Sequence, residues 1–306
     1  PGTAPGRGER TWTVHTGTPD ARRQNLRVLR DQVLGLDAAP LVVDVGAAEY
    51  QWDTQVFDKL VESAIVRKLG FEPDPDAFRA AVAKAGENAE FIEAAVGDGR
   101  RRTLYLCKGR HMTSLLPPNP EVLGLFGYAT AEVERELEID TITLDSVSRA
   151  HEGSLVKLDI QGAELLVLEH AQRVLARHPI VQFEGSSLEM YRGQPSMFEL
   201  GAWLEAKGFH FHMVSKKNHM PFRFRNGERV GVGVNQVLEY DLVFVPGLEA
   251  IRQMSAADVK ARAFMAHSVY QSSDLAALWL QELDRRDGTD LFGDFRTYLE
   301  EAKVDA

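Results

Sequence analysis

The chain has 306 residues, enough for one large domain or two small ones, and its hydrophobic content of 44% is ordinary for a globular protein. It carries 35 Lys and Arg residues against 45 Asp and Glu residues, a formal charge of −10, and the basic residues are spread along the chain. This balance argues against a nucleic acid as the partner. The single cysteine, Cys107, excludes an intramolecular disulfide and any zinc site that needs two thiolates.

The same features bear on where the protein works. No apolar run approaches the roughly 18 residues needed to cross a bilayer, and residues 1–10 lack the apolar stretch of a secretory signal. A lone cysteine also fits a reducing compartment. We therefore expect a cytoplasmic protein with no membrane partner.

The two ends of the chain have patterns of their own. The first residues are rich in Gly, Pro and Arg, and apolar residues then recur at the spacing of a helix over residues 21–36. From about residue 248 onward the pattern is helical and charged, with no further strand. We therefore divide the chain into an N-terminal arm and helix (1–38), a central domain (39–247) and a C-terminal helical extension (248–306).

The central domain alternates short apolar runs with helical patterns, which is the rhythm of β-α-β units that build a parallel sheet. The expected parallel strands are residues 41–45, 67–71, 91–96, 155–160 and 180–184. The expected helices are residues 56–65, 76–84, 163–175 and 198–207. Two expected antiparallel pairs are 103–107 with 137–144 and, at the sheet edge, 209–214 with 238–245. The sequence thus predicts an α/β fold with a doubly wound, mostly parallel sheet, an antiparallel edge strand and helical extensions at both ends.

The first informative motif is the strand at residues 41–45 and the glycine after it. Asp44 stands near the strand end, and Gly46 would let the backbone turn closely around a ligand. Ligands of open α/β sheets bind at this carboxyl edge. A strand followed by Asp-x-Gly also occurs for turn geometry alone, so both interpretations stay open.

The second motif is Phe71-Glu72-Pro73, where the next strand ends. A carboxylate there can bind both hydroxyls of a ribose, which indicates an adenosine ligand; the alternative is a surface carboxylate before a proline turn. The first turn of the domain lacks G-x-G-x-x-G, the glycine pattern that approaches a pyrophosphate. A cofactor without a phosphate therefore fits better than a dinucleotide.

The third motif is the strand-turn-helix sequence KLDIQGAE at residues 157–164. A strand that ends in Lys-x-Asp-x-x-Gly-x-Glu before a leucine-rich helix resembles the signature of the FkbM-type methyltransferases, which depend on S-adenosylmethionine. The Phe-Glu-Pro motif and the Thr-Leu-Asp of residues 143–145 are similar to the same family, and the resemblance spans about residues 40–246. The alternative is a plain strand-turn-helix whose glutamate favours the helix start.

The resemblance implies a Rossmann-like methyltransferase fold for residues 39–247 and S-adenosylmethionine as the cofactor. It implies that Asp44 and Gly46 line the methionine end of the cofactor and that Glu72 binds the ribose.

It also implies an adenine site and a transfer site. Ala95, Gly97 and Asp98 would lie by the adenine. Asp159, which belongs to the cofactor site as well, and Glu164 would lie near the transferred methyl group or the substrate.

The expected reaction is methylation of a hydroxyl on a small metabolite such as a sugar, a polyketide or another product of secondary metabolism. Oxygen is favoured over nitrogen by the resemblance only. The acceptor must lose a proton, and a carboxylate serves as the base only if burial raises its pKa. We predict Asp159, Glu184 and His212 as catalytic residues, although strand alternation alone could place His212 beside His210.

The remaining expectations concern ligands and partners. We expect no metal, although Asp159 and Glu184 could share a divalent ion that polarises a diol. Residues 185–195 and 216–235 are either acceptor-binding loops or ordinary connections. The C-terminal helices could pair subunits in a homodimer, but packing within the chain is favoured. Two rival functions stay open: a non-catalytic binding protein on the same fold and, less favoured, a nucleotide-cofactor oxidoreductase.

Overall fold

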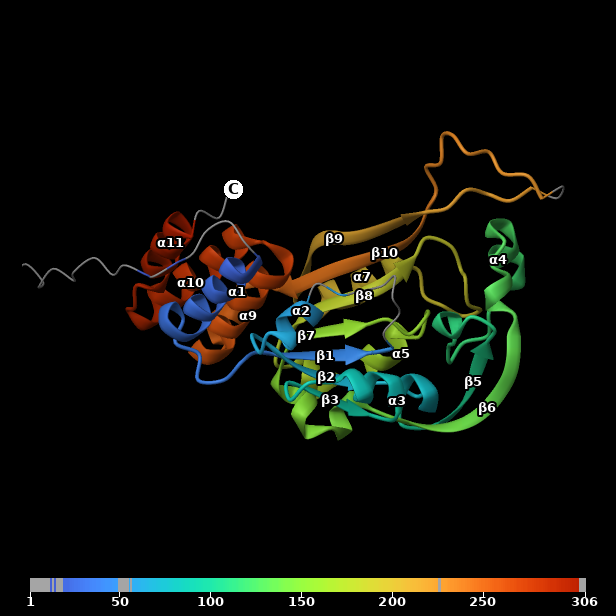
Figure 1. Ribbon diagram of the computed structural model, residues 1–306, viewed down its shortest axis with the longest axis horizontal. Coiled ribbons are helices and arrows are strands. Elements are labelled where there is room, and N and C mark those ends of the chain that lie inside the picture. The colour runs from blue at the N-terminus through green and yellow to red at the C-terminus, as the bar shows by residue number, and fades with distance from the viewer. Residues whose placement is uncertain are drawn as a thin grey trace, which may run out of the picture.

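The computed structural model describes residues 12, 14, 19–48, 55, 57–224 and 227–302, and its centre is a seven-stranded sheet (Figure 1). The strand order is β3-β2-β1-β7-β8-β10-β9, so the order reverses between β1 and β7. The strands are β1 (Leu41–Val45), β2 (Arg67–Phe71), β3 (Ala89–Ile92), β7 (Gly153–Leu158), β8 (Ile180–Ser186), β9 (Phe209–His219) and β10 (Val237–Pro246). The strands from β3 to β8 in this order run parallel, whereas β10 is antiparallel to both β8 and β9.

Both faces of the central strands β1, β2, β7 and β8 are buried, as in a doubly wound sheet. Because neighbouring strand residues point to opposite faces, Val43 and Val156 pack on α5 (Glu164–Glu169), α6 (Gln172–Leu175) and α7 (Met197–Ala206). Val42 and Leu155 pack in a second core with the helix after β1 and with the helices from both ends of the chain. Those helices are α1 (Pro19–Val28), η1 (Leu29–Val33), α2 (Asp58–Glu62), α8 (Leu248–Gln253), α9 (Ala256–Tyr270), α10 (Ser273–Asp287) and α11 (Leu291–Glu301).

A smaller sheet lies toward the carboxyl ends of the parallel strands. It has the order β4-β6-β5, formed by β4 (Ala95–Val96), β5 (Arg101–Cys107) and β6 (Val133–Ile142). The connection from β5 to β6 contains the 3₁₀ turn η2 (Arg110–Met112) and α4 (Pro120–Phe126). Figure 1 shows this unit at one end of the molecule and α1, α9, α10 and α11 at the other.

The predicted fold class is confirmed, including the antiparallel edge strand and helices at both ends of the described chain. Two predicted elements are divided. The strand expected at 91–96 ends at Ile92, where Ala94 N–H donates to the Ile92 carbonyl, and β4 then pairs with β6. The helix expected at 163–175 breaks into α5 and α6, because Asp145 accepts hydrogen bonds from the N–H groups of Arg173 and Val174 and so caps a new helix start.

The C-terminal extension shares its core with the sheet. Arg262 of α9 is only 1% exposed, and its guanidinium donates to the carbonyls of Arg177 at 2.7 Å and His178 at 3.1 Å, just before β8. These bonds join the extension to the central sheet. The domain boundaries at 38 and 247 stay a prediction, and residues 1–11, 13 and 15–18 of the expected N-terminal arm and helix lie outside the described residues.

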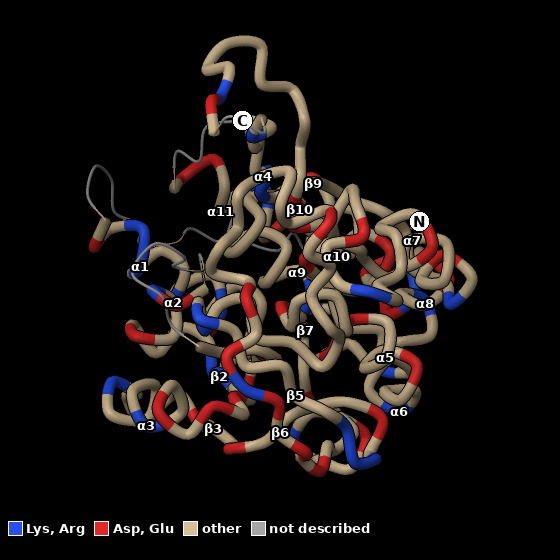
Figure 2. The backbone as a smooth tube through the Cα atoms, turned by 90° about the vertical axis from the view of Figure 1, so that its right-hand side faces the viewer, with Lys and Arg blue, Asp and Glu red and all other residues tan. Residues whose placement is uncertain are grey.

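The charge distribution agrees with the sequence. Figure 2 shows acidic and basic residues interspersed along the described chain, without a continuous basic stripe. Over the same residues, no helix is both long and apolar enough to cross a membrane.

Stability should depend on pH through His267, which is 6% exposed on α9 and packs against the rings of Phe295 and Tyr298. Burial lowers the pKa of His267 from 6.5 to about 4. The unfolded chain therefore gains a proton near pH 6.5 that the folded chain does not. The contribution of His267 to the free energy of unfolding is therefore complete above pH 6.5. It falls by about 1.4 kcal/mol per pH unit from there toward pH 4.

Urea unfolding of the wild type and of His267→Gln at several pH values measures this contribution. The variant should lose that slope, whereas His210→Gln, at an exposed position of β9, should keep it. Parallel pH curves for the wild type and His267→Gln would contradict the assignment.

Candidate functional site

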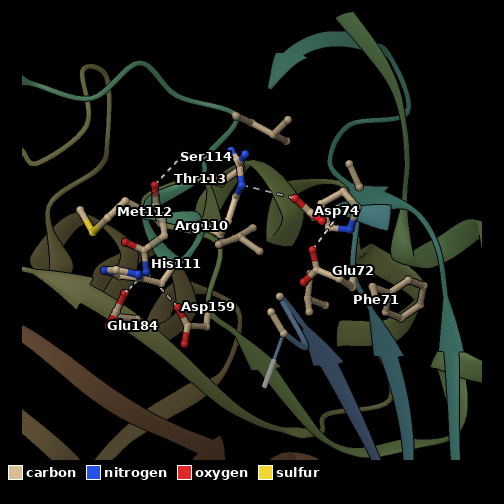
Figure 3. Close-up of a pocket in the computed structure, with 18 of the residues that line it drawn as sticks. Phe71, Glu72, Asp74, Arg110, His111, Met112, Thr113, Ser114, Asp159 and Glu184 are labelled. Carbon is tan, nitrogen blue, oxygen red and sulfur yellow. Dashed lines mark hydrogen bonds and ion pairs between the residues drawn. The ribbon is translucent and has the colours of Figure 1, made fainter. Parts of the chain in front are cut away.

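A cavity of about 300 Å³ lies at the carboxyl ends of β1, β2, β7 and β8 (Figure 3). One wall consists of these strand ends, and the opposite wall consists of residues 110–115 from the β5–β6 connection. Polar residues of β9 and β10 close a third side. Of the site residues predicted from sequence, five line this cavity: Gly46, Glu72, Ala95, Asp159 and Glu184.

Gly46 forms the tight floor of the cavity. Its N–H donates to the Phe71 carbonyl at 3.1 Å, and its φ of +80° lies in the region that favours glycine. A Cβ atom at this position would lie 2.0 Å from the carbonyl oxygen of Asp159. The missing side chain therefore lets β1 and β7 end side by side at the cavity.

Asp44 lies behind this floor and does not line the cavity. Its carboxylate is 3.0 Å from Lys68 Nζ and 3.4 Å from Lys157 Nζ, and all three side chains are buried. Burial alone would raise the pKa of Asp44, but the two lysines outweigh it and hold that pKa below its usual value. The structure thus shows Asp44 as the centre of a buried ion cluster that ties β1 to β2 and β7.

Glu72 faces the cavity from the end of β2 (Figure 3). Its Oε1 accepts a hydrogen bond from Asp74 N–H at 2.8 Å, and Asp74 in turn caps α3 (Pro75–Lys84). The residue is 6% exposed, and burial raises the pKa of its carboxyl group to about 7. Its carboxylate is therefore held in place at the strand end.

Asp159 and Glu184 meet across the side chain of Gln161. Gln161 Nε2 lies 3.1 Å from Asp159 Oδ1 and 2.6 Å from Glu184 Oε2, so the amide donates to both carboxylates. The Tyr191 hydroxyl lies 2.9 Å from Gln161 Oε1 and fixes the amide orientation. Burial, and then the charge of Asp159, raise the pKa of Glu184 well above its usual value. Glu184 is therefore easier to protonate than an exposed glutamate.

Glu164, in the KLDIQGAE motif of residues 157–164, stabilises a turn and is not part of the cavity wall. It is 1% exposed and accepts hydrogen bonds from the N–H groups of Ile160 at 3.1 Å and Gly162 at 3.2 Å. Burial raises the pKa of its carboxyl group to about 7. Glu164 shapes the turn that carries Asp159 and Gln161, and it does not line the cavity.

Besides Asp44 and Glu164, three further predicted residues lie outside the cavity lining. Asp98 binds Arg102 at 2.6 Å, and this hydrogen bond lowers the pKa of Asp98 to about 2. Gly97 pairs with the end of β6 through a hydrogen bond to the Ile142 carbonyl. His212 Nε2 lies 2.7 Å from Ser272 Oγ, at the helical extension. The catalytic interpretation of His212 therefore has no support in this geometry.

The structure brings a different histidine, His111, into the cavity. His111 belongs to η2, and Figure 3 shows its side chain beside Asp159 and Glu184. Nothing in the sequence marks this residue, because η2 lies in the irregular connection between β5 and β6. Among the described residues, no group of three or more His, Cys, Asp and Glu side chains is arranged to hold a metal ion.

The chain was compared with protein families, curated proteins and solved structures. A family model described as Methyltransferase FkbM domain matches residues 44–211, more than half of the 306-residue chain. A search of curated proteins finds no match.

Solved structures give only distant likeness. LepI in complex with SAM is 11% identical with a TM-score of 0.34, and the match covers 78% of this chain and 49% of LepI. TYW2 of P. horikoshii in complex with MeSAdo is 10% identical with a TM-score of 0.32, over 75% of this chain and 64% of that one. TYW2 of M. jannaschii in complex with AdoMet is 11% identical with a TM-score of 0.32, over 72% and 76%. The chain thus spans about half the length of LepI.

Proposed function

The chain belongs to the FkbM methyltransferase family, and from this premise we propose that it transfers a methyl group from S-adenosylmethionine to a hydroxyl of a small metabolite. The observation that carries the proposal is a single cavity with Glu72 on one side and the Asp159–Gln161–Glu184 group on the other. One cavity can therefore hold a nucleoside cofactor and an acceptor together.

The cofactor end fits an adenosine without a phosphate chain. Glu72 offers a fixed carboxylate to a ribose, and Gly46 leaves room for close approach of a ligand to the backbone. Ala95 lines the same cavity, where an adenine would lie. The sequence of residues 44–54 has one glycine, Gly46, and so lacks the glycine-rich turn that approaches a pyrophosphate, which disfavours a dinucleotide.

The bound cofactor supplies an activated methyl group on a positively charged sulfur, so the protein must mainly position the acceptor and exclude water. Asp159 and Glu184 lie where they can hold an acceptor hydroxyl by hydrogen bonds. The raised pKa of Glu184 makes this carboxyl group easier to protonate than an exposed glutamate, and the protonated form can donate a hydrogen bond as well as accept one. This group suits a polar, hydroxylated acceptor such as a sugar or a polyketide.

The finer parts of the proposal rest on the sequence. The single cysteine supports the cytoplasmic location that we propose. A place in secondary metabolism is proposed on the family resemblance alone, and a homodimer on the helical pattern of residues 248–306.

Replacing Glu72 tests the cofactor end. Glu72→Ala should weaken binding of S-adenosylmethionine roughly 100-fold, because a charged acceptor of two hydrogen bonds is lost. Since burial raises the pKa of Glu72 to about 7, wild-type affinity should also rise from pH 6 to pH 8, roughly across that value, and Glu72→Gln should remove the rise.

Isothermal titration calorimetry measures both effects, with Glu93→Ala at an exposed position as the matched control. Affinities of Glu72→Ala and Glu93→Ala that agree within about threefold, a difference below 1 kcal/mol, would reject the ribose contact.

A further inference from the structure

The η2 turn is held firmly against the cavity on both sides of His111. Arg110 donates to the Cys107 carbonyl at 3.1 Å and to Glu134 at 2.9 Å. Met112 is 2% exposed, and its carbonyl lies 3.1 Å from the Tyr191 hydroxyl. The backbone that carries His111 is therefore fixed by its two neighbours.

Tyr191 joins this turn to the acid pair. Its hydroxyl contacts Met112 on one side and Gln161 Oε1 on the other, and Gln161 donates to Asp159 and Glu184. A second link is the hydrogen bond from Ser114 Oγ to the Gln161 carbonyl, at 2.7 Å. The histidine and the two carboxylates thus belong to one rigid group, although they come from three separate parts of the chain.

The ring of His111 has room because Gly109 has no side chain. A Cβ atom on Gly109 would lie 2.8 Å from His111 Cε1 and 3.2 Å from Nδ1. The ring therefore folds back over Gly109, and Figure 3 shows it on the side of the cavity that holds Asp159 and Glu184. Glu72 lies across the cavity from this group.

We infer that His111 is the general base that takes the proton of the acceptor hydroxyl during methyl transfer. This inference rests on the proposed function. The acceptor oxygen forms its bond to the methyl carbon while the carbon–sulfur bond breaks and leaves its electron pair on sulfur. The hydroxyl proton passes to a ring nitrogen of His111, and the electron pair of the O–H bond stays on oxygen. The products are the methyl ether, the neutral thioether of the cofactor and an imidazolium.

The surroundings suit both states of the ring. Burial lowers the pKa of His111, so the ring is neutral and able to accept a proton at pH 7, while the charge of Asp159 opposes that shift and favours the imidazolium once it forms. The other titratable groups that line the cavity are Glu72, Asp74, Arg110, Tyr128, Glu184, Lys216 and Glu239.

Activity of His111 variants tests the inference, with a hydroxylated acceptor that the wild type methylates, found by screening monosaccharides, phenols and macrolactone alcohols. His111→Asn should lower kcat by about 10² to 10⁴-fold, the usual worth of a general base. Calorimetry should show S-adenosylmethionine affinity within about threefold of the wild type. The matched control is His210→Asn, at an exposed position of β9 outside the cavity, which should keep wild-type kcat.

Two readouts separate a base from a structural residue. Wild-type kcat should rise with pH through a value below 6.5 and then level off, and His111→Asn should lack that step. Added imidazole should restore part of the activity of His111→Ala. A kcat for His111→Asn within fivefold of the wild type, or a loss in His111→Ala that imidazole does not restore, would overturn the inference. Failure of the wild type to bind S-adenosylmethionine would reject the proposed function together with it.

Discussion

Gly46→Ala should lower the free energy of unfolding by more than about 3 kcal/mol and abolish measurable binding of S-adenosylmethionine. An alanine at a φ of +80° costs about 1 to 2 kcal/mol from backbone strain alone. Its Cβ atom would also lie 2.0 Å from the Asp159 carbonyl oxygen, which belongs to backbone that cannot move freely. Relief of that overlap must separate the ends of β1 and β7, at a further cost of about 1 to 3 kcal/mol, and displaces Asp159.

Gly208→Ala is the matched control for this prediction. Gly208 has a φ of +84°, but a Cβ atom there would meet nothing within 4 Å. Gly208→Ala should therefore lower the free energy of unfolding only by the backbone strain of about 1 to 2 kcal/mol. It should leave S-adenosylmethionine affinity unchanged. Urea unfolding and calorimetry measure the two effects. Equal loss of stability in the two variants would show that the close approach at Gly46 has no energetic importance.

Asp44→Asn should be comparably damaging, with a loss of about 3 to 5 kcal/mol in unfolding free energy, because it leaves Lys68 and Lys157 buried without their shared carboxylate. Lys68 keeps one partner, Asp58 at 3.2 Å, and Lys157 keeps Asp159 at 3.3 Å. The variant should also weaken cofactor binding. Without the Asp44 charge, Lys157 would pair more strongly with Asp159 and shift this carboxylate away from the cavity.

Urea unfolding at neutral pH measures this loss. Asp76→Asn is the control, because Asp76 is 90% exposed in its side chain and its pair with Arg79 lies on the surface. The two substitutions remove the same charge. A stability of Asp44→Asn within about 1 kcal/mol of Asp76→Asn would contradict a buried ion cluster that holds β1, β2 and β7 together.

The sequence predicts the cavity residues that stand at strand ends. Gly46, Glu72, Asp159 and Glu184 each follow or close an apolar run, and the carboxyl ends of parallel strands meet at one edge of the sheet. Their placement follows from local pattern and a general rule of topology. The same rule does not distinguish Asp44 from Gly46, two positions further on, because which of them faces the cavity depends on the lysines of neighbouring strands.

The histidines show where local pattern is insufficient. Strand alternation predicts on which face of the sheet His212 lies, but not which end of the molecule its side chain approaches. In the structure the His212 side chain lies against Ser272 of the helical extension. His111 reaches the cavity through the contact between Tyr191 and Met112, residues 79 positions apart in the chain. Asp98 is paired with Arg102 across a turn that follows β4, a local ion pair that only the structure reveals.

The central claim is that the cavity binds S-adenosylmethionine, and calorimetric titration of the wild-type protein with S-adenosylmethionine and, separately, with NAD tests it most directly. We expect micromolar binding of S-adenosylmethionine with a stoichiometry of about one per chain, and no binding of NAD, because the floor has no turn for a pyrophosphate. Binding of NAD alone would contradict the methyltransferase account. Binding of neither ligand would favour a non-catalytic protein on the same fold.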